Sequence, residues 1–512
     1  MHPKHASLII ATIATGMIYL DQSAVNIILP AIQRDLSITI SDLQWILNIF
    51  ILLTTAPLLL CGVLGDRFGR VRILKIGMIL FGCGSLACGL INSFEWLLVF
   101  RAIQGLGASM IAAVGLAILH YHSPVEERGR LIGTWATCTT IIISMGPTFA
   151  GAMVEWFHWQ YVFLVNLPAV LVAIWIAQRW VPENSSDKPT MHISWISTLL
   201  LLVGMGSLLF ALIEVSRKGS SVLLMTCLGT GGVTLLIGFL QRQRSRSNAL
   251  IPSAVFEYSR FVAINLITLW QWLAIAGVFF VLPLHLQWTQ GYSPLETGMA
   301  MLPITTMVAL LSRSAGKIAD RFGAFIPISS GIFCVGIAVG CLAWSRSLDH
   351  YWLGLFPILI IYGIGMAALI APLTTVAMNS LPVTYSGIAS GVNNSASRIS
   401  TMVSIALIGS FMSLYFEPKW QGVVQSSGLA LDLKNDLIAQ AGMLGAITLS
   451  DIDNSTIRES LFLSKNELLT SSFSWVMAVA AAVSLLSLAV LILLNNRQTI
   501  DRHSFWDVSD KA

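Results

Sequence analysis

The sequence predicts an all-α integral membrane protein with fourteen transmembrane helices. Of its 512 residues, 55% are hydrophobic and only 11% are charged, whereas a soluble domain carries about 25% charged residues. The mean hydropathy is +0.78. Long apolar runs recur along the whole chain, with short polar segments between them. Most of the molecular surface must therefore face lipid rather than water.

The spans follow from the runs that reach about 20 residues, the length that crosses a bilayer. Before a polar linker, these runs lie at 7–30, 43–64, 73–92, 96–119, 131–154 and 161–181. After the linker, they lie at 193–215, 221–240, 260–284, 296–316, 324–344, 352–375, 389–416 and 472–494. The first run is longer than a signal-peptide core and lacks a small-residue cleavage site, so we interpret it as a retained helix.

Lysine and arginine in the short loops predict the orientation, because cytoplasmic loops carry more of them. One set of alternate loops holds Arg67, Arg70, Arg72, Lys75, Arg128, Arg130, Lys188, Arg242, Arg244, Arg246 and Arg321. The opposite set holds only Arg34, Arg217, Lys218 and Arg346. We therefore expect both termini to be cytoplasmic. The segment 417–471 is then external, and its mixed apolar and polar stretches favour an amphipathic hairpin over a free loop.

A short internal repeat divides the chain. Gly65-Asp66-Arg67-Phe68-Gly69 follows the second span, and Ala319-Asp320-Arg321-Phe322-Gly323 follows the tenth. Related halves with substrate bound near the midplane are typical of alternating-access carriers. The predicted division is a six-helix half at 1–181, inserted helices 7 and 8 at 182–258, a second half at 259–495 with external loop 417–471, and a cytoplasmic tail at 496–512.

Several motifs resemble the major facilitator superfamily, and specifically its fourteen-helix drug/proton antiporter family. The resemblance covers nearly the whole chain. It is carried by Gly62 to Arg72 in the loop 2–3 motif, Leu97 to Ala108 in the fourth helix, Leu20-Asp21 with Val25-Asn26 in the first, Leu286 to Gly298, and Gly387 to Asn394. The fifth-helix antiporter motif keeps Gly146, Pro147 and Gly151, but Ile142 and Ala150 stand where glycines are usual.

The resemblance implies roles for particular residues. Asp21 would carry the proton and Arg101 would modulate it, since a carboxylate or guanidinium inside a membrane span is costly without a function or a partner. The structural alternative is that Asp21 is bonded locally and that Arg101 ties backbone carbonyls of neighbouring helices. Gly146 and Pro147 would kink the fifth helix and let it approach its neighbours closely.

The repeated loop motif would form a cytoplasmic gate. Its residues are Asp66, Arg67, Gly69, Arg70, Asp320 and Arg321, with Glu126, Glu127 and Arg128 as expected loop partners. The alternative is that the arginines only determine topology. Separately, we expect Glu214, near the end of helix 7, to form a salt bridge with Arg217 or Lys218.

Polar and aromatic side chains within the spans are candidates for a substrate cavity, where aromatic rings can stack on a cation. They are Asn26, Gln104, Trp135, Trp270, Gln271, Tyr362, Asn393 and Asn394. Aromatic residues in membrane proteins serve more often as packing or interface anchors. The alternative reading for these side chains is therefore structural.

The leading functional hypothesis is proton-coupled efflux of lipophilic, cationic compounds across the bacterial inner membrane by alternating access. Helices 10 and 13 hold no Asp or Glu beyond Glu296, so a dedicated exporter of one endogenous metabolite, such as a siderophore or an antibiotic, stays open. A non-transporting membrane receptor is a more remote alternative, and an enzyme the remotest, because the sequence shows no reactive cluster.

Cofactors and partners follow from the same survey. The seven cysteines show no metal-ligand spacing, and no phosphate-binding glycine loop ends in Lys-Ser/Thr. We expect no metal and no cofactor, with the proton gradient as the energy source. The expected partners are a small-molecule substrate, protons and the lipid bilayer. We expect no nucleic-acid partner and a monomeric state.

Overall fold

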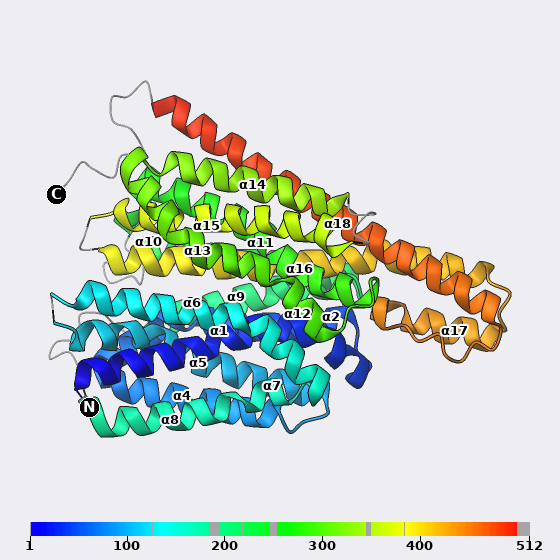
Figure 1. Ribbon diagram of the computed structural model, residues 1–512, viewed down its shortest axis with the longest axis horizontal. Coiled ribbons are helices and arrows are strands. Elements are labelled where there is room, and N and C mark those ends of the chain that lie inside the picture. Colours follow the sequence, from blue (N-terminus) through cyan, green and yellow to red (C-terminus); the bar gives the residue numbers. More distant parts are fainter. Residues whose placement is uncertain are drawn as a thin grey trace. The chain divides into compact units, whose positions relative to one another are not determined.

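The computed structural model of the chain is built of α-helices (Figure 1). It describes residues 2–124, 126–183, 194–217, 219–245, 253–344, 350–382 and 385–498, and these ranges contain no β-strand. The loop cations Lys188, Lys218, Arg246, Arg346 and Arg502 lie outside the described residues, as does the predicted tail from 499 onward.

The predicted first six spans are all present. They are α1 (Pro3–Leu36), α2 (Ile40–Thr55) with α3 (Leu58–Phe68), α4 (Arg70–Cys88), α5 (Phe94–His122), α6 (Arg128–Trp156), and α7 (Tyr161–Leu164) with α8 (Asn166–Trp180). Helices α2 and α3 meet at a 42° bend next to Pro57, because proline cannot donate a backbone hydrogen bond.

The remaining predicted spans are present as well. They are α9 (Trp195–Glu214), α10 (Val222–Ser245), α11 (Ser259–Trp288), α12 (Pro294–Ala300) with α13 (Leu302–Phe322), α14 (Phe325–Ala343), η2 (Tyr351–Leu355) with α15 (Phe356–Asn379), α16 (Ser386–Ser426) and α18 (Ser455–Gln498). Among the described residues, 13 helices are long and apolar enough to cross a membrane, and the bent α2–α3 pair makes 14. The predicted fold class is confirmed.

Contacts group the chain into two compact units. Unit 1 comprises Met1–Ile32, Asp42–Ala211 and Ser221–Ser253, and unit 2 comprises Gln33–Ser41, Leu212–Ser220 and Ala254–Ala512. In unit 1, α4 packs along α5; in unit 2, α11 packs along α16 and α18. Most of the inserted pair, α9 and α10, groups with unit 1. The predicted domain boundaries stay a prediction.

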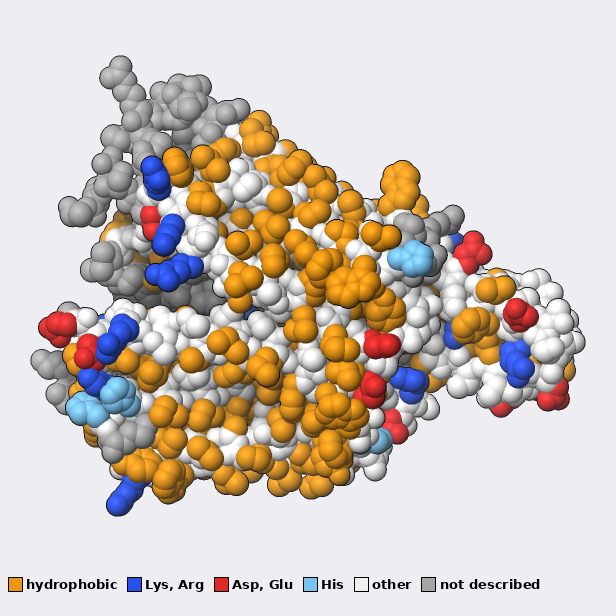
Figure 2. All heavy atoms as spheres, viewed as in Figure 1, with side chains coloured by type: hydrophobic (Ala, Val, Ile, Leu, Met, Phe, Trp, Pro, Cys, Tyr) orange, Lys and Arg blue, Asp and Glu red, His pale blue; other side chains and the backbone are white. Residues whose placement is uncertain are grey.

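The distribution of side chains on the surface matches a lipid-facing protein. On the face drawn in Figure 2, apolar side chains cover the middle stretches of the helices, and charged side chains gather near the helix ends. Large exposed apolar residues include Leu171, Trp175, Leu310 and Leu493. Contiguous apolar surface of this kind is unstable in water and is expected where helices meet hydrocarbon.

The segment 417–471 forms a helical hairpin within unit 2, as predicted. Between the end of α16 and the start of α18 the chain forms α17 (Leu431–Ala439), which contacts α16, and η4 (Gln440–Ala446), which contacts both long helices; this is the orange region of Figure 1. The Trp420 indole donates to the Leu437 carbonyl at 3.1 Å. Lys465 Nζ donates to the carbonyls of Gly445 and Ile447 at 3.3 and 3.4 Å. These buried contacts order the hairpin.

Candidate functional site

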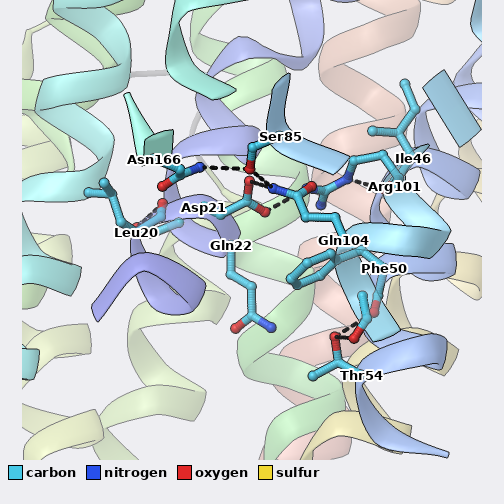
Figure 3. A network of polar contacts seen from close by, with 12 residues as sticks. Leu20, Asp21, Gln22, Ile46, Phe50, Thr54, Ser85, Arg101, Gln104 and Asn166 are labelled. Atoms are coloured by element: carbon cyan, nitrogen blue, oxygen red, sulfur yellow. Dashed lines mark hydrogen bonds and ion pairs between the residues drawn. The ribbon is translucent and has the colours of Figure 1, made fainter. Parts of the chain in front are cut away.

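A buried ion pair joins two helices of unit 1 (Figure 3). Arg101 Nη1 on α5 lies 2.5 Å from Asp21 Oδ2 on α1, and the two side chains are 1% and 0% exposed. The two predicted coupling residues therefore meet each other, although 80 residues separate them in the chain. Two opposite charges taken out of water require mutual pairing and further hydrogen bonds to be stable.

Gln104 completes the polar cluster around Asp21. Its Nε2 donates to Asp21 Oδ1 at 3.0 Å and to Ser85 Oγ on α4 at 2.8 Å, while its Oε1 accepts from Arg101 Nη1 at 2.7 Å. Asn166 Nδ2 on α8 also donates to Ser85 Oγ, at 3.4 Å. Gln104 was predicted as a cavity residue, and the structure makes it a partner of both coupling residues.

The Arg101 guanidinium has partners besides the carboxylate. Its Nε donates to the Ile46 carbonyl on α2 at 3.3 Å. Its Cζ lies 4.3 Å from the centre of the Phe50 ring and 5.6 Å from that of Phe163, where the π-faces attract a cation. Arg101 thus pairs with Asp21 and also ties a neighbouring carbonyl, and its role in proton coupling stays a prediction.

Glycines of the fourth-helix motif bring the surrounding helices close enough for these bonds. A Cβ at Gly107 would lie 2.5 Å from the Phe81 nitrogen on α4, and one at Gly105 would lie 2.7 Å from the Phe50 carbonyl on α2. Only a residue without a side chain fits there. The motif thus sets the α2, α4 and α5 spacing that holds the cluster.

Arg101 has partners that do not depend on the charge of Asp21. When Asp21 is ionised, Arg101 and Gln104 stabilise its charge. When Asp21 is protonated, Arg101 keeps Gln104 Oε1, the Ile46 carbonyl and two aromatic faces as partners.

The loop 2–3 motif forms a compact turn between α3 and α4. Arg70 Nη2 bonds Asp66 Oδ1 at 2.7 Å. Gly69 has φ +101°, a conformation that favours glycine. Glu183 Oε1, just beyond α8, accepts from the Val71 nitrogen at 2.9 Å and from the Arg72 nitrogen at 3.4 Å. A carboxylate at a helix N-terminus is favourable because the first amides have no helical partner.

Glu183 is the carboxylate that reaches this motif, and the sequence reasoning missed it. Glu127, which was expected as a partner, bonds Lys4 at 2.8 Å and Arg130 at 3.5 Å. The Lys4 hydrogen bond lowers the pKa of Glu127. The signal that could have identified Glu183 is its position directly after the sixth span, where the chain returns to the same predicted side as the start of α4.

The second copy of the motif repeats the turn, and within the part of the chain that the structure describes it has no salt bridge like that of Asp66 and Arg70. Gly323 has φ +83°, and the Arg321 guanidinium lies 5.1 Å from the Phe322 ring, as Arg67 lies 5.6 Å from the Phe68 ring. Asp320 is exposed, and Ala324 stands where Arg70 stands in the first copy. The repeat therefore extends to backbone conformation, while the charge pair belongs to the first half.

The fifth-helix motif lies on α6, which runs through Pro147 without a break. Gly146 faces Ser23 of α1, where any Cβ would overlap the serine hydroxyl, and Gly151 is buried. Ile142 replaces a glycine of the family pattern, and it packs against Gly16 of α1, where a Cβ would lie 2.6 Å from the Ile142 Cδ1. Gly16 supplies a small residue on the facing helix, which allows the close approach.

Three predicted cavity residues of unit 2 lie in helix packing. Gln271 of α11 donates to Ser487 of α18 and to the Ser484 carbonyl. Tyr362 of α15 donates to the Ile275 carbonyl at 3.1 Å. Asn393 of α16 donates to Thr268 Oγ1 at 3.0 Å. All three are buried, so interhelical bonding accounts for them.

The other cavity candidates differ in exposure. Trp270 is 39% exposed. Asn394 is exposed and donates to the Ser390 carbonyl one turn earlier, at 3.0 Å, and half-buried Asn26 donates to the Gln22 carbonyl at 3.2 Å. Trp135 packs against a cluster of Ala11, Leu119 and Leu131. Their role in a cavity stays a prediction.

The salt bridge expected at the end of helix 7 is present. Glu214 Oε2 lies 3.1 Å from Arg217 Nη1, and the Ser220 hydroxyl donates to the Glu214 carbonyl at 2.6 Å. The contacts are local and close the end of α9. The prediction of a structural ion pair is confirmed with Arg217 as the partner.

Comparison with known proteins agrees with this architecture. Residues 11–405 match the model of the Major Facilitator Superfamily. The multidrug resistance protein Stp of Mycobacterium tuberculosis is 31% identical over 80% of this chain and 76% of its own length. The tetracenomycin C resistance and export protein of Streptomyces glaucescens is 27% identical over 97% of this chain and 92% of its own length.

A solved structure shares the fold. A bacterial homologue of the human lysosomal transporter Spinster superposes with a TM-score of 0.66 at 18% identity, covering 97% of this chain and 98% of the other. Together with the match over residues 11–405, the repeated loop motif and the fourteen spans, this shows that the chain belongs to the major facilitator superfamily of membrane transporters.

Proposed function

We propose that this transporter exports lipophilic, cationic compounds in exchange for protons, with Asp21 as the proton carrier. The observation that carries the proposal is the Asp21–Arg101 pair. Intramembrane ionisable residues are costly and mark ion pathways or substrate sites. Asp21 has partners that suit its ionised form, and Arg101 has partners that suit the neutral form of Asp21. When Asp21 is neutral, the Arg101 guanidinium keeps neutral hydrogen-bond acceptors and two aromatic faces as partners.

The relatives support export as the direction. Stp is named a multidrug resistance protein, JefA of M. tuberculosis a drug efflux pump, and the S. glaucescens relative a resistance and export protein. The close α1–α6 contact at Gly146, in a helix whose motif the family associates with export, points the same way. Protons moving inward would drive the compound outward.

Export of a single metabolite is the second candidate. The described helices of unit 2 that correspond to predicted spans 10 and 13 carry acidic residues only toward their ends, at Glu296, Asp320 and Glu417. Family members that handle bulky cations often carry further acids deep in this half of the molecule. Relatives named for resistance to methylenomycin A and tetracenomycin C favour an antibiotic-like compound under this candidate.

The proposed location is the bacterial inner membrane, with both termini cytoplasmic. The loop cations that predict this orientation include Arg67, Arg70, Arg128 and Arg130, which lie at helix ends. Protease-accessible tags at the termini and within 417–471 test it in intact spheroplasts. We expect cleavage only at the tag in 417–471. Cleavage at either terminus would reverse the orientation.

Efflux from everted membrane vesicles tests the function directly. Everted vesicles are prepared from a pump-deficient host that expresses the protein. With a respiratory substrate their interior should become acidic, and the vesicles should then accumulate a fluorescent lipophilic cation. Collapse of the proton gradient should abolish the accumulation. If the vesicles accumulate none of a panel of dyes, quaternary ammonium compounds and antibiotics, the single-metabolite candidate is favoured. Metabolite profiling of a deletion strain then tests that candidate.

A further inference from the structure

Two residues outside the predicted site, Ser85 and Asn166, extend the cluster away from Asp21 (Figure 3). Ser85 is 0% exposed and Asn166 is 1% exposed. Ser85 Oγ accepts hydrogen bonds from Gln104 Nε2 at 2.8 Å and from Asn166 Nδ2 at 3.4 Å. A serine oxygen has two lone pairs, so these two donors occupy both of them. The Ser85 hydroxyl hydrogen must therefore point to a third group.

Within the described part of the chain, Asn166 lacks a hydrogen-bond donor to its side-chain oxygen. Its Oδ1 is buried and has no hydrogen-bond partner among the described residues. A buried unpaired acceptor costs about 1–3 kcal/mol and commonly marks a bound water. Exchanging the two amide atoms of Asn166 does not remove this deficit, because Ser85 would then donate to the oxygen and the nitrogen would be left unpaired. One side of this amide requires a partner in either orientation.

A single water molecule satisfies both residues. It accepts the Ser85 hydroxyl hydrogen and donates to Asn166 Oδ1, which gives it two of the partners that buried waters typically have. Its second hydrogen remains to be donated.

The carboxylate lies within reach of this water. Gln104 Nε2 bonds both Asp21 Oδ1 and Ser85 Oγ, and because the two N–H bonds of an amide diverge, these oxygens lie about 5 Å apart. One bridging water spans such a gap. The other ionisable groups that interact here are Arg101 on α5 and Cys88, which lies one turn beyond Ser85 on α4.

We propose that Ser85 and Asn166 hold a buried water beside Asp21 and that this water passes protons to and from the carboxylate. In uptake, a proton reaches the water oxygen, and one proton leaves that oxygen to form the O–H bond of Asp21, so the water is regenerated. Release runs in reverse. Ser85 and Asn166 are positioning residues, and the proton-transfer role rests on the proposed function of Asp21 as proton carrier.

Infrared difference spectroscopy on the purified, reconstituted protein tests the water itself. Spectra recorded as Asp21 is titrated should contain a water O–H band that shifts in ¹⁸O-labelled water. We expect this band to be lost in Asn166→Leu and in Ser85→Ala, and the Asp21 carboxyl band to be lost in Asp21→Asn. Thr54→Val is the matched control, because Thr54 is a buried hydroxyl on α2 that donates to the Phe50 and Gly105 carbonyls.

Absence of the labelled band in the wild type, its persistence in both variants, or its equal loss in Thr54→Val would overturn the proposal. Ser85→Ala changes little volume, so the test does not depend on the folding of Asn166→Leu. In transport, proton-driven efflux should fall in Ser85→Ala, because the water that passes the proton is lost. A wild type that shows no proton-driven efflux would refute the proposed function, while the infrared result would still decide whether the water is present.

Discussion

Arg101 Nη1 and Asp21 Oδ2 lie 2.5 Å apart with side chains that are 1% and 0% exposed. The pair joins α1 to α5, and no bulk water screens it. Breaking a buried pair by removing one partner is costly because it leaves the other charge uncompensated, whereas replacing both partners can be nearly neutral. The stability of unit 1 should therefore depend on the two residues jointly.

The first prediction concerns this dependence. Arg101→Leu should lower the free energy of unfolding by about 3–5 kcal/mol, and the double variant with Asp21→Asn should recover part of that loss. Thermal unfolding of the purified variants in detergent measures the coupling. Arg70→Leu is the control, because its partner Asp66 is 43% exposed and such pairs contribute about 0–1 kcal/mol. Additive losses in the Asp21–Arg101 cycle would show that the pair is not coupled.

A second prediction follows from the turn at Gly69. Alanine at this position would have to adopt φ +101° and would place its Cβ 2.5 Å from Glu183 Oε1. Gly69→Ala should therefore destabilise the protein by at least about 1–2 kcal/mol. At Gly62, on α3, an added Cβ meets no neighbouring atom within 4 Å. Gly62→Ala should therefore be neutral or stabilising. Equal melting temperatures for the two variants would argue against a strained turn.

The third prediction concerns Glu183, which accepts from the first amides of α4. Glu183→Ala should accelerate hydrogen exchange in peptides covering residues 69–74, because the helix start loses its acceptor. Glu127→Ala removes a carboxylate that bonds Lys4 instead, and it should leave this peptide unchanged. If exchange at 69–74 responds to both variants alike, Glu183 has no specific role at the motif.

Adjacent asparagines on α16 provide the fourth prediction. Asn393 is buried and bonds Thr268 and Asn265 of α11, whereas Asn394 is exposed and bonds its own helix. Asn393→Leu should lower thermal stability by about 1–3 kcal/mol because it leaves buried groups without a donor. Asn394→Leu should leave stability unchanged. Any effect of this variant on substrate affinity can then be assigned to a lost contact between Asn394 and the substrate. The reverse pattern would contradict the packing described for α11 and α16.

Much of the fold was predictable because the bilayer imposes simple rules. All fourteen spans follow from run length alone, even α13 with Arg313 and α16 with Arg398 inside them. The turns at Gly69 and Gly323 follow from the repeat. The end of α16 and the start of α18 extend beyond the apolar runs, because the helices of the hairpin pack against one another rather than against lipid.

The site was predictable only in part. Asp21, Arg101 and Gln104 stand out because charged or amide groups in apolar helices are costly. Ser85 and Asn166 do not stand out, since small polar residues are common in spans and only tertiary contact brings α4 and α8 to Gln104. For Gln271 and Tyr362, residue type indicated a cavity, while the geometry gives each an interhelical partner. Sequence periodicity does not distinguish those two environments.

Proton release on substrate binding tests the central claim most directly. Purified wild-type protein in weakly buffered detergent should release protons when a lipophilic cation such as tetraphenylphosphonium is added. Asp21→Asn should bind the cation and release none, because its side chain mimics the protonated carboxyl. Equal release from both proteins, or binding by the wild type with no release, would contradict the assignment of Asp21 as the proton carrier.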